Sequence, residues 1–216
     1  MNPFIQRHLG ASYGRLVIRG TLIIILLLAF VIALSLLEQW RTDRELGAIL
    51  PALISDQVLK DLQDRSGGRE IQIIFLREPK SLWKRDGYHR GLLFERKSLF
   101  SGSSSPLTRA SFILSNVLPR NIRAALKLPT GARDFFISRK ELEEITRADY
   151  KARFPNDLGY TIVSHAGLNL SGTEAILYFD HFCGPLEGSC GGGQYLLMRK
   201  VNGVWRIVDG QVIWTS

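Results

Sequence analysis

The chain has two cysteines, and both lie in the stretch Cys183-Gly-Pro-Leu-Glu-Gly-Ser-Cys190. The glycine and proline residues between them allow the chain to turn back, so the two Cα atoms can approach within the roughly 4.4–6.8 Å that a disulfide requires. In an oxidising compartment we therefore expect a disulfide between Cys183 and Cys190. Unpaired thiols and a metal or redox site are the alternatives. The redox spacing C-x-x-C is absent, and a zinc site that used His181 would need a fourth ligand at a spacing the sequence does not offer.

Three further side chains could transfer protons if a cavity brought a substrate to them: His165, His181 and Tyr178. Separate histidines on an apolar face are more often hydrogen-bonded core residues than catalysts. The sequence places no pair of titratable groups to do acid-base work. We therefore predict no catalytic residue, no cofactor and no metal site, and these three side chains stay candidates for an alternative function.

The candidates lie on a hairpin that alternating residues predict, formed by residues 160–168 and 174–182. If Leu168 pairs with Glu174, His181 lies opposite Thr161 and about 13 Å from His165, so the two histidines cannot form a dyad. Tyr178 and Asp180 lie on the other face of this hairpin. Alternation assigns the first face to the core, with the residues Val163, His165, Ala175, Leu177, Phe179 and His181.

A second hairpin follows, with strands at 194–201 and 204–208 and the two-residue turn Asn202-Gly203. Gly210 is expected to mark a bulge before the last strand continues. Four apolar residues of this hairpin share a side and are predicted to be core: Leu196, Met198, Trp205 and Ile207.

Helices and one earlier strand precede these hairpins. The segment 71–76 (IQIIFL) predicts a strand, and Ser138-Arg-Lys-Glu141 is a capping box that begins a helix ending before Pro155. A helix is also expected from Ser55-Asp56 to the glycines at 67–68, and Pro106 and Pro119 are possible first residues of helices.

An uncharged apolar run from Gly20 to Leu37 sets where these elements lie. A helix of roughly 18 or more apolar residues is long enough to cross the hydrocarbon core of a bilayer. The preceding residues hold Arg7, Arg15 and Arg19 without an acidic residue, so they are expected to stay in the cytoplasm. The alternative is a signal peptide cleaved near Ala33-Leu34-Ser35, and in either case the rest of the chain lies outside the cytoplasm.

These observations predict the following organisation. Residues 1–19 are a cytoplasmic tail, 20–37 an inner-membrane signal anchor, 38–50 a short charged connector, and 51–216 one periplasmic or extracytoplasmic domain with its sheet core at 134–216. The fold class is α+β, with a curved antiparallel meander packed on helices.

The middle of the chain is basic, since residues 77–140 hold fourteen Lys and Arg against four Asp and Glu. Aromatic residues are interleaved with the charges, a mixture that could rest on an anionic surface, although an ordinary solvated face is the simpler interpretation. The residues of this predicted basic surface are Lys80, Lys84, Arg85, Arg90, Arg96 and Lys97. Outside the cytoplasm nucleic acid is excluded as a partner, and an envelope protein or an anionic envelope component is expected.

The stretch from Phe135 through the Cys-Gly-Pro-Leu loop to Asn-Gly-Val-Trp-Arg-Ile-Val and the closing Ile-Trp-Thr-Ser resembles the C-terminal domain of uncharacterised bacterial exported proteins. Its order of elements is also similar to the NTF2-like superfamily, in which a curved antiparallel sheet wraps helices around a cone-shaped cavity. The resemblance implies either a cavity lined by Asp, His or Tyr, as in the enzymes, or association through the sheet. Some non-catalytic members share this membrane layout, notably an inner-membrane assembly component of type IV secretion systems.

The sequence thus favours a membrane-tethered, non-catalytic binding or assembly module of the bacterial cell envelope. The alternative is a small-molecule enzyme of NTF2-like type that uses a cavity histidine for proton transfer.

Overall fold

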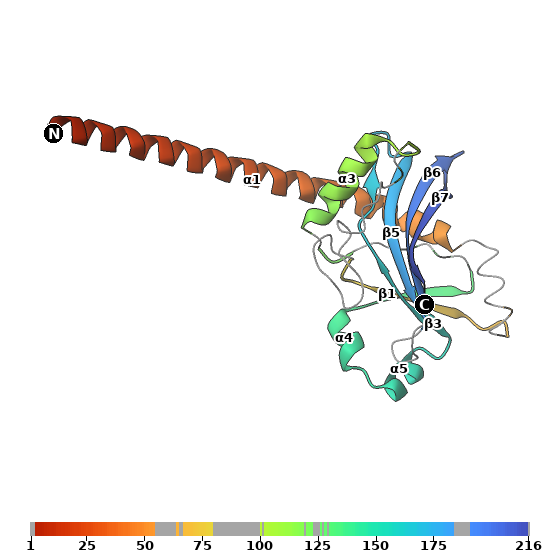
Figure 1. The fold of residues 1–216 in the computed structure, drawn as a ribbon. Coiled ribbons are helices and arrows are strands. Elements are labelled where there is room, and N and C mark those ends of the chain that lie inside the picture. The colour runs from red at the N-terminus through yellow and green to blue at the C-terminus, as the bar shows by residue number, and fades with distance from the viewer. Residues whose placement is uncertain are drawn as a thin grey trace.

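The structure is a computed structural model that describes residues 3–54, 64, 67–79, 100, 102–118, 120–122, 126, 128, 130–183 and 191–215, with side chains from residue 20 onward except Leu158. One long helix projects from a body that contains the sheet and the other helices (Figure 1). The elements are α1 (Pro3–Leu53), β1 (Ile71–Leu76), α3 (Pro106–Val117), β2 (Ala132–Ile137), α4 (Arg139–Glu144), α5 (Arg147–Arg153), β3 (Asp157–Val163), β4 (Gly167–Leu168), β5 (Glu174–Phe182), β6 (Gly191–Val201) and β7 (Val204–Thr215).

The seven strands form one mixed sheet in the order β2-β1-β3-β5-β6-β7, with β4 paired to β5. From β3 onward the pairings are antiparallel, as predicted. The expectation of a purely antiparallel meander is wrong for the other half, because β1 pairs in parallel with both β2 and β3. Parallel strands need a long crossover connection between them. The connection from β1 to β2 contains α3, and the connection from β2 to β3 contains α4 and α5.

Both faces of the central strands of this sheet are covered, so the fold has three layers there. On one face the end of α1 packs against Leu177, Met198 and Trp205. On the other face α3 packs against Tyr178 and Tyr195, and α5 packs beside them on Ile74. The sequence assigned only the first face to the core. The second face is equally buried because it carries a helix layer of its own.

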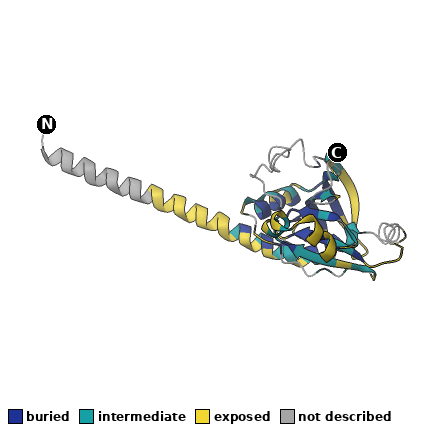
Figure 2. Ribbon diagram, turned by 90° about the horizontal axis from the view of Figure 1, so that it is seen from below, coloured by how far each residue is buried: buried dark blue, intermediate teal, exposed yellow. Residues whose placement is uncertain are grey.

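The stretch expected as a connector, 38–50, is instead the C-terminal part of α1. The helix continues without a break from the apolar run into the domain, where Leu46, Ile49 and Leu50 are completely buried. Figure 2 shows this change along α1, from exposed residues beyond the domain to buried ones within it. The apolar part contains the one described segment that is long and apolar enough to span a membrane, and its most hydrophobic window is only 6% buried.

Several local predictions are confirmed. The strand at 71–76 has the expected bounds, and Pro106 follows the N-cap Ser105 at the start of α3. The capping box of Ser138 and Glu141 begins α4, although the predicted helix divides in two because Thr146 caps a new helix, α5. Asn202 and Gly203 form the two-residue turn between β6 and β7, with φ values of 53° and 79°.

The last strand differs from its prediction in one respect. The pairing of β6 with β7 shifts between Leu197 and Met198 and again between Gly193 and Gln194, so the bulges flank Gly210 instead of falling on it. Ile207, expected in the core, pairs with Met198 directly before the first bulge and is 48% exposed. The predicted helix at 55–66, the helix start at Pro119 and the loop between the cysteines lie outside the described residues, apart from Asp64.

Candidate functional site

Polar side chains of α1 are buried against α3, in a contact that we call the α1–α3 seam and define by Ser35, Glu38, Gln39, Ser111 and Ser115. The last carbonyl groups of a helix have no partner within the helix. Gln39 Nε2 donates to the carbonyls of Ser115 at 2.8 Å and Leu118 at 2.6 Å, and Ser35 donates to Leu114 at 2.9 Å. The side chains of α1 therefore cap the C-terminal end of α3.

One turn further along α1, Asp43 faces His165, which is fully buried. Its Nδ1 lies 3.3 Å from Asp43 Oδ1, and its Nε2 lies 2.8 Å from the carbonyl of Arg120. A carbonyl can only accept, so Nε2 is the N–H donor, and Nδ1 is the nitrogen that faces the Asp43 carboxyl group. The side-chain amide of Asn116 forms two hydrogen bonds with the backbone of His165. Its Nδ2 donates to the His165 carbonyl, and its Oδ1 accepts from the His165 N–H. This histidine is therefore a structural link between α1 and the sheet.

The second histidine lies elsewhere, as the predicted register requires. His181 pairs with Thr161 across β3 and β5, and its Nδ1 lies 3.3 Å from the threonine hydroxyl. The register shifts by one residue further along, because Leu168 of β4 pairs with Ala175 instead of Glu174. The two histidines form no dyad.

Tyr178 belongs to a third location, a buried polar cluster on β5 and β7. Its hydroxyl donates to Asp180 Oδ1 at 2.6 Å, and Trp214 Nε1 donates to the same oxygen at 2.8 Å. A Cβ at Gly193 would lie 2.1 Å from this oxygen, so only glycine allows β6 to pass over the cluster. The structure thus separates the three candidate acid-base residues instead of gathering them.

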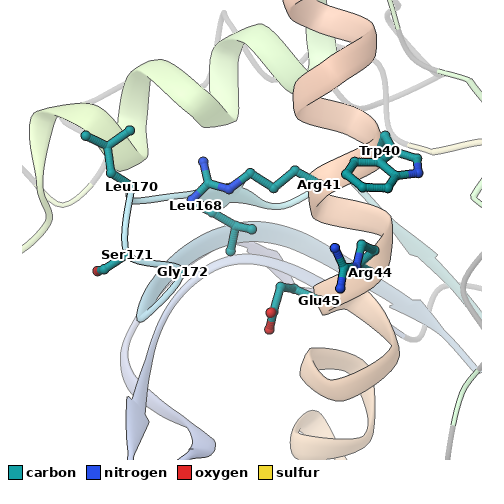
Figure 3. A pocket seen from close by; sticks show the side chains of 8 residues that line it. All are labelled: Trp40, Arg41, Arg44, Glu45, Leu168, Leu170, Ser171 and Gly172. Carbon is teal, nitrogen blue, oxygen red and sulfur yellow. The ribbon is translucent and has the colours of Figure 1, made fainter.

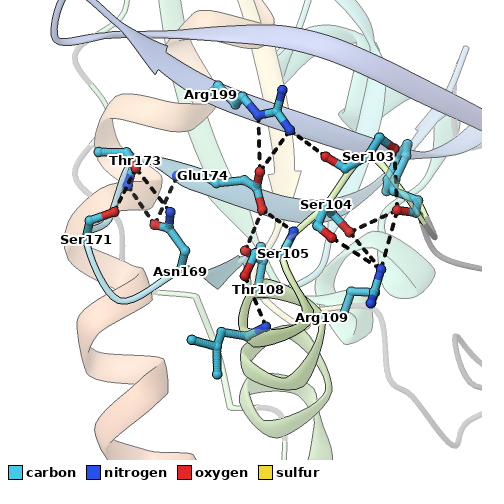
Figure 4. A network of polar contacts seen from close by, with 12 residues as sticks. Ser103, Ser104, Ser105, Thr108, Arg109, Asn169, Ser171, Thr173, Glu174 and Arg199 are labelled. Atoms are coloured by element: carbon cyan, nitrogen blue, oxygen red, sulfur yellow. Dashed lines mark hydrogen bonds and ion pairs between the residues drawn. The ribbon is translucent and has the colours of Figure 1, made fainter.

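The carboxylate of Glu174 joins α3 to the sheet, as Figure 4 shows. It accepts from the Ser105 amide and the Thr108 hydroxyl, both at 2.7 Å, and pairs with Arg199 at 3.1 Å. Burial by itself raises the pKa of this carboxyl group, but the two hydrogen bonds and the guanidinium outweigh it and hold the pKa below its ordinary value. The N-terminal end of α3 is therefore fixed as firmly as its C-terminal end.

A cavity of about 230 Å³ lies where α1 enters the domain (Figure 3). We call it the interfacial pocket, and neither histidine nor Tyr178 lines it. It lies between α1 and the turn after β4, and its lining residues are Trp40, Arg41, Arg44, Glu45, Leu168, Leu170, Ser171 and Gly172. The pocket therefore offers two guanidinium groups and apolar surface, and no proton-transfer pair of the predicted kind.

At one end of the strand order, β7 is an edge strand twelve residues long, and its first residues contact α1 through Trp205 and Glu45. We call this the β7 edge. No other described strand pairs with its outer side, and an open edge presents unpaired backbone groups. Four of its apolar side chains are also exposed, by 45 to 65%: Val204, Ile207, Val208 and Val212. This combination is typical of an interaction surface.

Two predicted sites remain untested by the geometry. Cys183 directly follows β5, but Cys190 lies outside the described residues, so the disulfide stays a prediction. All six residues of the predicted basic surface also lie outside them: Lys80, Lys84, Arg85, Arg90, Arg96 and Lys97.

Comparison of the chain with protein-family models, curated proteins and solved structures finds no match in any of the three.

Sequence reasoning missed the α1–α3 seam and the His165 partner Asp43. A signal was present, because Ser35, Gln39, Thr42, Leu46 and Ile49 recur at intervals of four and three residues, the spacing of one helix face. The small and polar types at the first three positions hid this face, since a buried stripe is usually recognised by apolar residues.

Proposed function

We propose that the protein is a membrane-tethered, non-catalytic binding or assembly module of the bacterial cell envelope. In this proposal α1 anchors the chain in the inner membrane with its N-terminus in the cytoplasm, and the sheet domain lies in the periplasm. The β7 edge is the docking element. It receives an extended segment of another envelope protein, which adds a strand to the sheet.

The exposure of β7 is the observation that carries this proposal. An edge with unpaired backbone groups can bind an extended segment through main-chain hydrogen bonds, while side chains such as Val212 supply apolar contact. The two bulges twist β7, which limits pairing with unrelated chains and favours a partner of matching shape.

The tether supports the same role. Because α1 is part of the domain core, the domain cannot swing freely about a flexible connector, and the β7 edge is held at a fixed place relative to the membrane. Restricting two partners to one membrane raises their effective concentration without any new contact. Ser35 is buried and bonded to Leu114, and this contact favours a retained anchor over cleavage near this residue.

The enzyme alternative gains no support from the described residues. His165 is enclosed by Asp43 and the carbonyl of Arg120, and Tyr178 and Asp180 are fully buried. His181 is half-buried, lies beside the Thr161 hydroxyl and does not line the interfacial pocket. A proton-transfer site requires a substrate to reach such a group.

Photo-crosslinking in intact membranes tests the proposal. A photoreactive amino acid at Val212 should give one abundant adduct with another envelope protein. The same amino acid at Leu107, which is 53% exposed on α3, is the matched control and should give none. An adduct of two copies of this chain would replace the proposed partner with self-association. Equal labelling from both positions, or no adduct from Val212, would contradict docking at the β7 edge.

A further inference from the structure

The interfacial pocket lies at the depth of lipid head groups if the apolar run spans the bilayer. A helix rises 1.5 Å per residue, so Arg41 and Glu45 lie about 6 and 12 Å beyond Leu37, the last residue of that run. The head-group layer on each side of the hydrocarbon core is roughly 5–8 Å thick, so Arg41 starts within it. Arg44 starts about 10 Å beyond Leu37, just above this layer, and its guanidinium is directed back toward it over Trp40. Trp40 lies where the hydrocarbon core meets the head-group layer, the level that tryptophan prefers, and 57% of its surface is exposed.

The charge of the pocket favours an anion. Arg41 pairs with Glu38, and Glu45 pairs with Lys200 at 2.8 Å and accepts from Trp205. These two carboxylates are therefore compensated by two cations. Arg44 forms no ion pair with the described part of the chain, and its guanidinium lies over the Trp40 ring at 5.3 Å. One exposed guanidinium, held in place by stacking, is thus left to bind a ligand.

The shape of the site adds apolar surface on both sides of that charge. Leu170 is 80% exposed at the tip of the turn after β4, whereas Leu37 is 62% exposed on the helix below Trp40. Residues 37, 40, 41 and 44 share one helix face, because they are three, four and seven positions apart. Figure 3 shows Arg41 extended from α1 toward the turn and Arg44 beside Trp40. Arg41 also donates to the carbonyl of Asn169, which fixes this turn to α1.

We propose that the interfacial pocket binds the phosphate of a phospholipid from the leaflet that surrounds α1, an inference that rests on the membrane tether of the proposed function. Arg44 supplies the charged donors to the phosphate, and the remaining N–H groups of Arg41 lie on the same helix face. The acyl chains lie along Leu37 and Trp40, and Leu170 enters the leaflet beside them. A bound lipid would thus join the turn after β4 to the anchor helix.

Native mass spectrometry of the full chain in mild detergent tests the site. We expect wild-type protein to retain dioleoyl phosphatidylglycerol about tenfold more strongly than the Arg44→Gln variant, as the loss of a charge-assisted pair implies. Arg44→Lys should fall between them, because it keeps the charge without the planar fork. Arg133→Gln makes the same change of charge at an exposed guanidinium that stacks over Phe135 on β2, at the other end of the strand order, and should behave as wild type.

Three results would overturn the proposal. One is equal retention of phosphatidylglycerol by wild type and Arg44→Gln. Another is equal retention of dioleoylglycerol, which lacks the phosphate. The third is full displacement of the lipid by millimolar inorganic phosphate, which would make this a site for a soluble anion. Retention of the chain in alkaline-washed membranes tests the tether separately, so a failure of the lipid site and a failure of the proposed function are distinguishable.

Discussion

Polar side chains are buried at the α1–α3 seam, whereas apolar side chains are exposed along the β7 edge. At the seam Ser35 and Gln39 are completely buried, but their donors meet carbonyl groups that α3 cannot satisfy by itself. At the edge Val212 is 65% exposed without any such compensation. The comparison indicates that the seam stabilises the contact between α1 and the rest of the domain, whereas the edge has the exposed apolar surface that the proposed docking requires.

The largest difference between the two regions should appear when apolar side chains are truncated. Ile49→Ala removes a fully buried side chain from the core end of α1 and should lower the free energy of unfolding by about 3 kcal/mol. Val212→Ala on the β7 edge should change it by no more than about 0.5 kcal/mol. Denaturation of the full chain in detergent, followed by tryptophan fluorescence, measures both. Similar small losses would mean that α1 is not part of the core.

Close packing of α3 on β4 gives the next effect. A Cβ at Gly167 would lie 2.1 Å from the backbone nitrogen of Phe112, so Gly167→Ala must push α3 away from the sheet. We expect a loss of about 2 kcal/mol in the same denaturation measurement. Gly210→Ala on β7 is the control, because its nearest atom would be 3.5 Å away, an ordinary contact. If both variants unfold at the same denaturant concentration, the contact between α3 and β4 is looser than described.

The Asp43 and His165 pair can be broken with little change of shape. Asp43→Asn removes the charge that faces the buried ring and should lower the free energy of unfolding by about 1.5 kcal/mol. Asp209→Asn makes the same change on the β7 edge and should have no measurable effect. A double-mutant cycle with His165→Gln should show coupling between the two sites, and strictly additive losses would contradict a direct link.

The smallest effect should be the dependence of stability on pH at Glu174. Its pKa in the folded chain lies below the ordinary value of 4.5, so the unfolded chain takes up the proton first as the pH falls. The stabilisation is therefore complete above about pH 4.5 and is lost as the pH falls through the folded pKa. Glu174→Gln should be about 1 kcal/mol less stable than wild type at pH 7, and this difference should shrink in acid.

Glu144→Gln provides the control for this titration, since the Glu144 side chain is 67% exposed and pairs only with Lys140 among the described residues. Its stability should follow wild type throughout. If the difference in free energy of unfolding between Glu174→Gln and wild type is constant from pH 7 to pH 3, the assigned hydrogen bonds are contradicted.

Local chemistry was enough to predict many elements of the fold. The capping box at Ser138, the turn at Asn202-Gly203 and the pairing of Thr161 with His181 each depend on residues close in sequence or on simple alternation. The parallel pairing of β1 with β2 and β3 depends on distant segments, and no local pattern fixes it.

The functional regions were harder to predict, because each contradicts the usual sorting of polar and apolar residues. Residues 38–45 are rich in charge and belong to the predicted connector at 38–50, yet Gln39, Thr42 and Asp43 have partners on α3, near the sheet or within α1. Ile207 matches the core pattern and pairs with the buried Met198, but it lies directly before a bulge on the edge strand and is 48% exposed. Burial of this kind depends on tertiary partners and on strand register, which one sequence does not display.

Amide hydrogen exchange of the full chain in lipid nanodiscs tests most directly whether α1 is both membrane anchor and core helix. The account predicts that residues 42–53, beyond the bilayer, exchange as slowly as the central strand β5, because both belong to one cooperative core. Rapid exchange of residues 42–53 beside a protected β5 would show a flexible connector and contradict the central claim.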